Sequence, residues 1–264
     1  MAELKGEALL DALERGEVRV AERDAAGRWI VHAWVKEAIL ELFRTSTVVA
    51  HALEAPAGAP GSASVFRDKG PLRVRRFSEK DGVRIVPGGS AVRRGAYLAP
   101  GVVCMPPMYV NIGAWIGAGT MIDSHALVGS CAQVGAKVHV SAAAQIGGVL
   151  EPAGARPVIV EDECFVGGNC GIYEGVLVRT GAVLAAGVIL TASTKVYDLV
   201  NQRELTGSRE SPLEIPERAV VVPGSRVLAG EWARARGLSA ACALIVKYRD
   251  AQTDRATALE DALR

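Results

Sequence analysis

The sequence predicts a mainly β protein, built on a parallel β-helix with a helical segment before it and a small β extension after it. An aliphatic residue or close substitute recurs at every sixth position, first from Val92 to Ile146 and again from Val160 to Val196. Half of the residues are hydrophobic but only 5% are aromatic, which suits narrow coils filled with Val, Ile, Leu and Ala. Neither an α-helix nor a flat sheet has a period of six, whereas a coil of three short strands produces it.

Residues 1–90 are expected to form a mostly helical N-terminal domain with a basic linker. Apolar residues recur at helical spacing over residues 3–15, and Gly16 is expected to end that helix. Residues 18–21 alternate like a short strand, and a turn follows at residues 24–27. A second, wider apolar face predicts a helix over residues 29–43 that includes Ile30.

The rest of this first domain is less regular. Residues 54–64 are rich in Pro, Gly and Ala and predict a loop or hinge. Residues 65–86 are mixed and basic, and most of their arginines are expected to lie on a solvated edge.

Residues 91–228 are expected to form the solenoid. The six-residue repeat, which we call the beat, is interrupted near residues 148–157. We expect one coil to carry an extruded loop there, and in repeat proteins such insertions often lie on the binding face. Residues 220–228 predict a last partial coil. In the C-terminal part, residues 229–264, we expect a strand over 241–248 and a short surface helix at the end.

Composition narrows the possible functions. The net charge of +1 gives no basic field for nucleic acid, and no apolar run is long enough for a membrane span. The N-terminus has no signal-peptide pattern, so we expect a cytoplasmic protein. Three of the five cysteines, Cys104, Cys164 and Cys170, fall on inward positions and predict buried thiols, and the spacing of the cysteines predicts no metal site.

The chemistry must lie outside the aliphatic interior, on corners, on loops or between chains. A three-sided prism packs naturally about a threefold axis, which suggests a trimer. Asp123 stands at a corner position that is usually Gly, although Asp is also a common turn residue. His125 and His139 are possible general bases, but an outward His is more often a plain surface residue. The pairs Gly147-Gly148 and Gly167-Gly168 let a ligand approach the backbone, or simply form corners.

The run MYVNIGAWIGAGTMIDSHALVGSCAQVGAKVHVS, followed by IGGVLEP, resembles the tetrahydrodipicolinate N-succinyltransferase family. The resemblance extends to GVRIVP, VIVEDECFVG and CALIVKY, and to the N-terminal segment that precedes the repeats. It therefore covers most of residues 16–250 and does not depend on the hexapeptides alone.

The resemblance implies a left-handed parallel β-helix and a homotrimer with the site between subunits. It implies transfer of a succinyl group from succinyl-CoA, a co-substrate rather than a tightly bound cofactor, to the amine of L-2-amino-6-oxopimelate. This small dicarboxylate is the ring-opened substrate in lysine and diaminopimelate biosynthesis. Neither a nucleic-acid partner nor a membrane partner is implied.

The resemblance also assigns residues. Arg84 of GVRIVP would bind a substrate carboxylate, and Asp123 of GTMIDS would bind and help deprotonate the substrate amine. Gly171 stands where some relatives carry a glutamate, so Glu174 is a candidate catalytic acid or base, or else a surface residue. His125 replaces the family's tryptophan. Gly148, Gly168 and Gly187 are candidates for contact with CoA, and no metal is expected.

Three other functions stay open at this point. A relative that uses acetyl-CoA on the same substrate is the main rival. A carbonic anhydrase of the same architecture would need closely spaced outward histidines, and a non-catalytic scaffold would bind no acyl-CoA.

Overall fold

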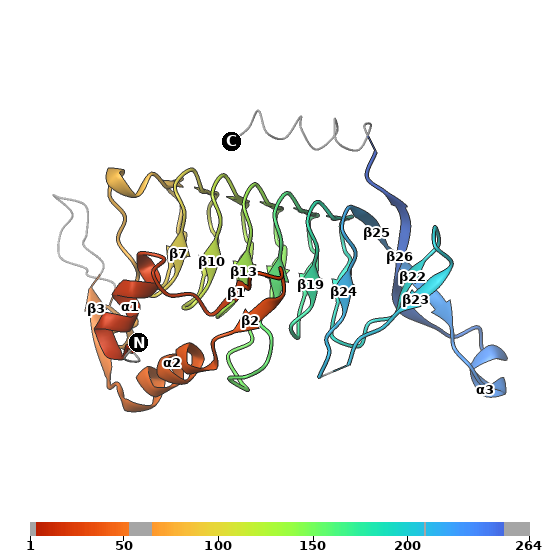
Figure 1. Cartoon of the computed structure of the whole chain (residues 1–264), viewed down its shortest axis with the longest axis horizontal. Helices are drawn as coiled ribbons and strands as arrows, with labels where there is room; N and C mark the ends of the chain where they lie inside the picture. Colours follow the sequence, from red (N-terminus) through yellow and green to blue (C-terminus); the bar gives the residue numbers. More distant parts are fainter. Residues whose placement is uncertain (1–3, 53–64, 209, 251–264) are drawn as a thin grey trace.

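A computed structural model describes residues 4–52, 65–208 and 210–250, and it shows a three-sided solenoid between an N-terminal segment and a C-terminal arm (Figure 1). Successive coils stack along the long axis, and their strands form three parallel sheets. The predictions for residues 54–64 and for the final helix fall mostly or wholly outside the described residues.

Each side of the solenoid is one sheet. Sheet I contains β5 (Arg84–Ile85), β8 (Val103–Cys104), β11 (Met121–Ile122), β14 (His139–Val140), β17 (Phe165–Val166), β20 (Val183–Leu184) and β25 (Ala219–Val227). Sheet II contains β6 (Ala91–Val92), β9 (Tyr109–Val110), β12 (Leu127–Val128), β15 (Gln145–Ile146), β18 (Gly171–Ile172) and β21 (Ile189–Leu190). Sheet III contains β7 (Tyr97–Leu98), β10 (Trp115–Ile116), β13 (Gln133–Val134), β16 (Ile159–Val160), β19 (Leu177–Val178) and β24 (Glu214–Ile215). The corners are named by the sheets they join: I–II, II–III and III–I.

The six-residue beat is the inward ladder of these coils. Every member of the series from Val92 to Leu190 is the second residue of a two-residue strand and is almost wholly buried. Burying one such aliphatic side chain stabilises the fold by roughly 1.5–3 kcal/mol, so the repeated ladder is the main source of stability. The first residue of each strand points outward, where side chains can meet other elements or solvent.

The six-residue repeat ends at Leu190, so the prediction that it continues to Val196 was wrong. Val196 is buried in β22 (Val196–Asp198), which pairs with β23 (Arg203–Leu205) and with β26 (Ser239–Tyr248) instead of adding a strand to sheet III. Sheet III resumes at β24, and Val220–Val221 of β25 then adds to sheet I. The expected last partial coil near residue 220 is therefore confirmed.

The interruption near residues 148–157 is an extruded loop at the II–III corner, as expected. It connects β15 directly to β16. Leu150, which the beat placed inside a coil, packs instead against the helical cluster of the N-terminal segment. The Lys36 ammonium, fully buried, donates to the carbonyl of Ala155 at 2.7 Å and ties the loop to α2 (Ala33–Thr45). Burial lowers the pKa of Lys36.

The N-terminal segment covers part of sheet III (Figure 1). It contains α1 (Gly6–Glu14), a hairpin of β1 (Ala21–Arg23) and β2 (Trp29–Val31), and then α2. The predicted helix over 29–43 thus begins only at Ala33, and the strand expected at 18–21 lies at 21–23. The Asp24 carboxylate accepts the backbone N–H groups of Ala26 and Arg28, and this turn pairs the two short strands. Strand pairing therefore overrides the helical pattern of Trp29 to Val31.

Gly16 ends α1 as predicted. Its φ is +73°, and a Cβ there would lie 2.8 Å from the ring of Tyr97, so a side chain would collide with the solenoid. A second hairpin, β3 (Val48–Ala52) with β4 (Val65–Lys69), and a 3-10 turn (Glu79–Asp81) lead into the first coil.

The C-terminal arm projects beyond the last coil (Figure 1). It combines β25, the short helix α3 (Glu231–Arg234) and β26, which includes the strand expected at 241–248. Asp198 anchors this arm: its carboxylate accepts hydrogen bonds from Asn201, Arg203 and the Tyr248 hydroxyl. Burial raises the pKa of Asp198, but these donors outweigh it and hold the pKa at about 2.

The low pKa of Asp198 makes a prediction about acid stability. A carboxyl whose folded pKa lies below its unfolded value stabilises the fold above about pH 4, and this contribution is lost as pH falls toward 2. We expect Asp198→Asn to lower the free energy of unfolding by about 2 kcal/mol at pH 6. Urea unfolding at pH 6 and near pH 2 should show the gap between wild type and variant narrowing. A gap that is independent of pH would contradict the assignment, and Glu163→Gln, at an exposed corner, is the control.

Candidate functional site

Asp123 follows β11 at the I–II corner, with its side chain partly exposed. Its Oδ1 accepts the backbone N–H of Ser124 at 2.7 Å, and its own N–H donates to Val140. No described residue donates to the second carboxylate oxygen. That oxygen is therefore available to bind an ammonium group.

Beyond Asp123 the I–II corner carries only small or short side chains, coil after coil. The corner residues of the next three coils are Ser141, Ala142 and Ala143, then Gly167, Gly168 and Asn169, then Ala185, Ala186 and Gly187. Backbone hydrogen bonds join successive coils here, for example from Gly187 N–H to the Gly168 carbonyl at 2.9 Å. We call this edge the small-residue corner. The structure thus brings Gly168 and Gly187 onto the same edge as Asp123.

Backbone donors remain available along this corner. The N–H groups of Ala142, Gly168 and Ala186, one in each coil, have no acceptor among the residues that the structure describes. Small side chains leave such groups accessible, so an extended ligand could lie along the edge and hydrogen bond to the backbone.

Arg84 lies on the same side of the solenoid. It is the exposed first residue of β5, which pairs with β8, and β8 pairs with β11. Two strand spacings separate Arg84 from Met121, or about 10 Å. The guanidinium makes no hydrogen bond or ion pair with a described residue. The unpaired Arg84 guanidinium and the Asp123 corner thus lie on the same side of the solenoid, with β8 between their strands.

Glu174 and Gly148 are not part of this arrangement. Both lie at the II–III corner, so sheet II separates them from Asp123. Glu174 is exposed and its Oε2 accepts the N–H of Ala192 at 3.1 Å. Gly148 is exposed at the start of the extruded loop.

Tyr173 is a residue that sequence reasoning missed. A Cβ at Gly171 would collide with Cε2 of the Tyr173 ring, so the tyrosine occupies the space over this glycine. The Tyr173 hydroxyl donates to Oε1 of Gln145 at 2.9 Å. The outward position of Gly171 on sheet II was the available signal, because a residue that lacks a side chain there leaves room for a neighbour.

The two coil histidines differ in environment. His125 is exposed two residues after Asp123, with φ of +62°. His139 was expected at the surface, but it is only 6% exposed and stacks on Phe165 with ring centroids 5.0 Å apart. On the outward face of sheet I, His139 lies between Met121 and Phe165, and these apolar neighbours explain the burial of the imidazole.

The thiols are not placed for nucleophilic chemistry. Cys104, Cys164 and Cys170 are buried in the ladder, as predicted, and Cys131 is buried against the N-terminal helices. Burial raises the pKa of Cys131 to about 12, so the thiolate is scarce at neutral pH. Within the described ranges, no cluster of three His, Cys, Asp or Glu residues could hold a metal ion.

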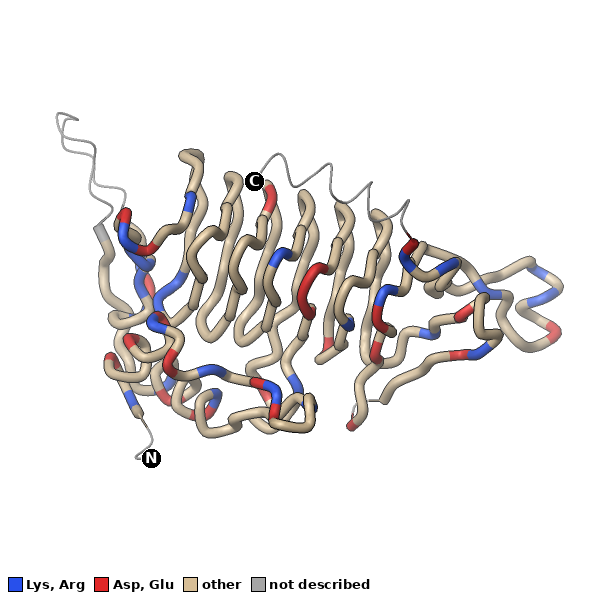
Figure 2. The backbone as a smooth tube through the Cα atoms, turned by 45° about the horizontal axis from the view of Figure 1, so that its top comes forward, with Lys and Arg blue, Asp and Glu red and all other residues tan. Residues whose placement is uncertain are grey.

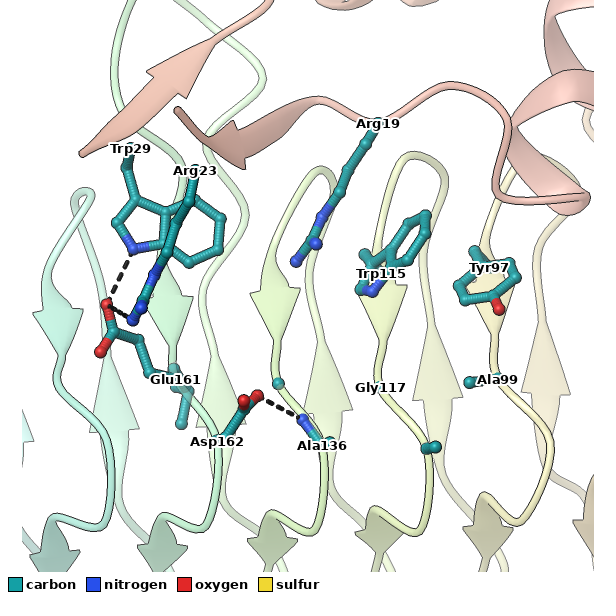
Figure 3. A pocket seen from close by; sticks show the side chains of 13 residues that line it. Arg19, Arg23, Trp29, Tyr97, Ala99, Trp115, Gly117, Ala136, Glu161 and Asp162 are labelled. Atoms are coloured by element: carbon teal, nitrogen blue, oxygen red, sulfur yellow. Dashed lines mark hydrogen bonds and ion pairs between the residues drawn. The ribbon is translucent and has the colours of Figure 1, made fainter. Parts of the chain in front are cut away.

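A cavity of about 390 Å³ lies on a different part of the molecule, between the β1–β2 hairpin and sheet III (Figure 3). Its lining includes Arg19, Trp29, Trp115 and Asp162, and none of the site residues expected from the sequence.

Arg75, one of the basic residues before the first coil, does not lie on a solvated edge as expected. Its side chain is mostly buried, forms an ion pair with Asp81 and stacks on Phe77.

Charged residues gather on the N-terminal segment and the C-terminal arm, while the coils between them are mostly uncharged (Figure 2). No described helix has the length and apolar character needed to cross a membrane.

Known protein families match both the N-terminal segment and the coils of this chain. Residues 7–45 match a family model described as tetrahydrodipicolinate N-succinyltransferase N-terminal, and residues 157–192 match the hexapeptide repeat of succinyl-transferase. The 2,3,4,5-tetrahydropyridine-2,6-dicarboxylate N-succinyltransferase of Nitrobacter hamburgensis is 46% identical over 261 residues, covering 97% of this chain and 87% of that protein. Proteins of the same name from Rhodopseudomonas palustris and Bradyrhizobium diazoefficiens are 44% and 45% identical; they cover 98% and 97% of this chain, which spans 88% of each.

Proposed function

Because the chain belongs to the 2,3,4,5-tetrahydropyridine-2,6-dicarboxylate N-succinyltransferase family, we propose that it transfers the succinyl group of succinyl-CoA to tetrahydrodipicolinate. The acceptor reacts as its ring-opened form, L-2-amino-6-oxopimelate, in diaminopimelate and lysine biosynthesis. This proposal rests on 46% sequence identity to the Nitrobacter hamburgensis protein over 97% of the chain, which includes the N-terminal segment as well as the repeats.

We place the reaction at the small-residue corner. Asp123 has one free carboxylate oxygen and is the only acid at this edge in the coils described above, so it is suited to hold the substrate ammonium and assist its deprotonation. The amine must be neutral to attack the thioester carbonyl. The CoA arm would lie along Gly168 and Gly187, where free backbone N–H groups can donate to its amide carbonyls.

The transfer needs no covalent enzyme intermediate. The amine nitrogen attacks the thioester carbon, and a backbone N–H group of the corner stabilises the oxyanion. The nitrogen then gives up a proton to the Asp123 carboxylate or to solvent as the C–S bond breaks, which leaves the amide product and CoA thiolate. One well-placed oxyanion donor is worth about 3 kcal/mol in hydrolases. A thiolate with a pKa near 8.5 leaves with little help from an acid, which suits a corner with few titratable groups.

We propose that the active enzyme is a homotrimer and that a second copy completes the site. Within one chain Glu174 and Gly148 lie across sheet II from Asp123, so these residues could act with Asp123 only from a neighbouring copy. The left-handed winding of the coils is likewise part of this proposal and follows from the family. A cytoplasmic location stays a prediction.

The acyl donor is tested directly by kinetics. With tetrahydrodipicolinate as acceptor, kcat/KM for succinyl-CoA should exceed that for acetyl-CoA by at least about a hundredfold, because a site that binds the succinyl carboxylate leaves its own polar groups unpaired with acetyl. Equal or higher values with acetyl-CoA would identify an acetyltransferase instead. Lack of transfer from both donors would contradict the proposed function.

The variant Arg84→Lys tests which of the two substrates Arg84 binds. A lysine keeps the charge but loses the paired N–H geometry that suits a carboxylate, so we expect KM for the dicarboxylate acceptor to rise about tenfold. KM for succinyl-CoA should change less than twofold. Steady-state kinetics with each substrate varied measures both, and Arg28→Lys, on the exposed hairpin turn, is the control. An equal rise in both KM values would place Arg84 on the CoA side of the site.

A further inference from the structure

We propose that the cavity between the β1–β2 hairpin and sheet III binds a small organic monocarboxylate with a flat apolar body (Figure 3). The cavity lies on sheet III and the III–I corner, whereas the proposed succinyl transfer lies on the I–II corner. This ligand is therefore neither of the two substrates, and the proposal does not depend on the transferase reaction.

The cation that would bind the carboxylate is Arg19. Its side chain points into the cavity from the segment just before β1 (Figure 3), and its Nε donates to Oε1 of Gln133 at 2.6 Å. The guanidinium carbon lies 4.3 Å from the centre of the Trp115 ring. No described residue accepts a hydrogen bond from its two terminal nitrogens or forms an ion pair with it. Glu22 and Asp162 interact with the Arg19 guanidinium electrostatically, but neither accepts a hydrogen bond from it. Half-buried N–H donors without acceptors carry a desolvation cost that a bound carboxylate would relieve.

The neighbouring charged side chains already have partners, an ion pair for Arg23 and Glu161 and a backbone N–H for Asp162. Arg23 forms an ion pair with Glu161 at 2.5 Å, and the same carboxylate accepts from the indole N–H of Trp29. Asp162 Oδ1 accepts the backbone N–H of Ala136 at 2.7 Å. Two arginines and two acids line the cavity, so its formal charge is zero. A monoanion is therefore favoured over a phosphate dianion or the highly charged CoA.

The walls fit a flat apolar group. Tyr97 and Trp115 pack together with ring centroids 4.0 Å apart, and Trp29 lies on the other side of the Arg19 side chain (Figure 3). The floor is made of small residues, including Gly117 and Ala118. A Cβ at Gly117 would lie 2.5 Å from the backbone nitrogen of Ala136, so the stacking of the coils itself keeps the floor flat. The Ala118 N–H has no acceptor among the described residues and offers a second donor.

Phenylacetate is a suitable probe, with full-length protein and with both isothermal calorimetry and quenching of tryptophan fluorescence as readouts. We expect saturable binding of phenylacetate, and much weaker binding of acetate, which lacks the ring, and of benzyl alcohol, which lacks the charge. Arg19→Gln should weaken phenylacetate binding about tenfold or more. Arg28→Gln, on the adjacent β1–β2 hairpin and paired only with Asp24 among the described residues, should leave it unchanged.

Ala118→Leu provides an independent variant in case Arg19→Gln folds poorly. Ala118 is exposed in the cavity floor, so a larger side chain fills the space without disturbing the inward ladder. Phenylacetate binding should be lost while succinyl transfer is retained. No saturable binding to wild type, or equal affinity in both variants, would overturn the proposal. Neither result affects the proposed function, because succinyl transfer is measured separately.

Discussion

Asp123→Ala is expected to reduce kcat/KM for succinyl transfer by at least about a hundredfold, the usual contribution of a positioned acid or base. The side chain lies at a corner and supports the fold only through one local hydrogen bond to Ser124. The variant should therefore stay folded. Steady-state kinetics with succinyl-CoA and tetrahydrodipicolinate, together with thermal unfolding, measures both quantities.

The control for Asp123→Ala is Glu163→Gln, which removes an exposed carboxylate at the III–I corner of the same solenoid. It should keep near-normal kinetics. If Asp123→Ala retained kcat/KM within threefold of wild type, the assignment of this residue would be wrong. Loss of activity together with a lower unfolding temperature would show a structural role instead.

Val128→Asp is expected to prevent folding. Val128 is fully buried in the inward ladder of β12, between Val110 and Ile146 of the hydrophobic core. Burying a carboxylate without a partner costs several kcal/mol after relaxation, and lost packing adds to this. The total is comparable with the whole stability of a typical domain, about 5–15 kcal/mol. Circular dichroism and the soluble yield on expression would measure the result.

Gln145→Asp is the matched control for Val128→Asp. Gln145 is the exposed, outward residue of β15, which pairs directly with β12. The same new charge placed there faces solvent, so the protein should fold. A soluble, cooperatively unfolding Val128→Asp protein would contradict the inward assignment of the beat.

Short-range patterns in the sequence predicted the coils well because their cause is local. A two-residue strand and a tight corner fit within six residues, so the buried position repeats wherever the hexapeptide repeats. The same reasoning identified Gly16 and the turn at Asp24. It failed for Trp29 to Val31, where pairing with β1 outweighed a helical pattern, and for Val196, which is buried by β26 rather than by the next coil.

The outward residues were harder to predict. His139 and Arg75 are buried by neighbours that lie far away in the sequence or across a turn, and the pattern around them carries no sign of this. The cavity around Arg19 has the same origin. Its residues come from the segment of Arg19 to Trp29 and from four successive coils, and the hydrogen bond from Arg19 to Gln133 spans 114 positions of the chain.

By itself, the sequence determined the solenoid, its inward ladder and the unusual acid at the Asp123 corner, because each depends on neighbouring residues. Only the tertiary structure decided which residues share an edge. Val160 follows Ile146 by fourteen positions, and the six-residue repeat does not reveal how many corners the intervening chain turns. The loop turns one, because its residues are held by Lys36 and the N-terminal helices rather than by a sheet. That choice places Gly168 and Gly187 on the edge with Asp123, and Glu174 on another.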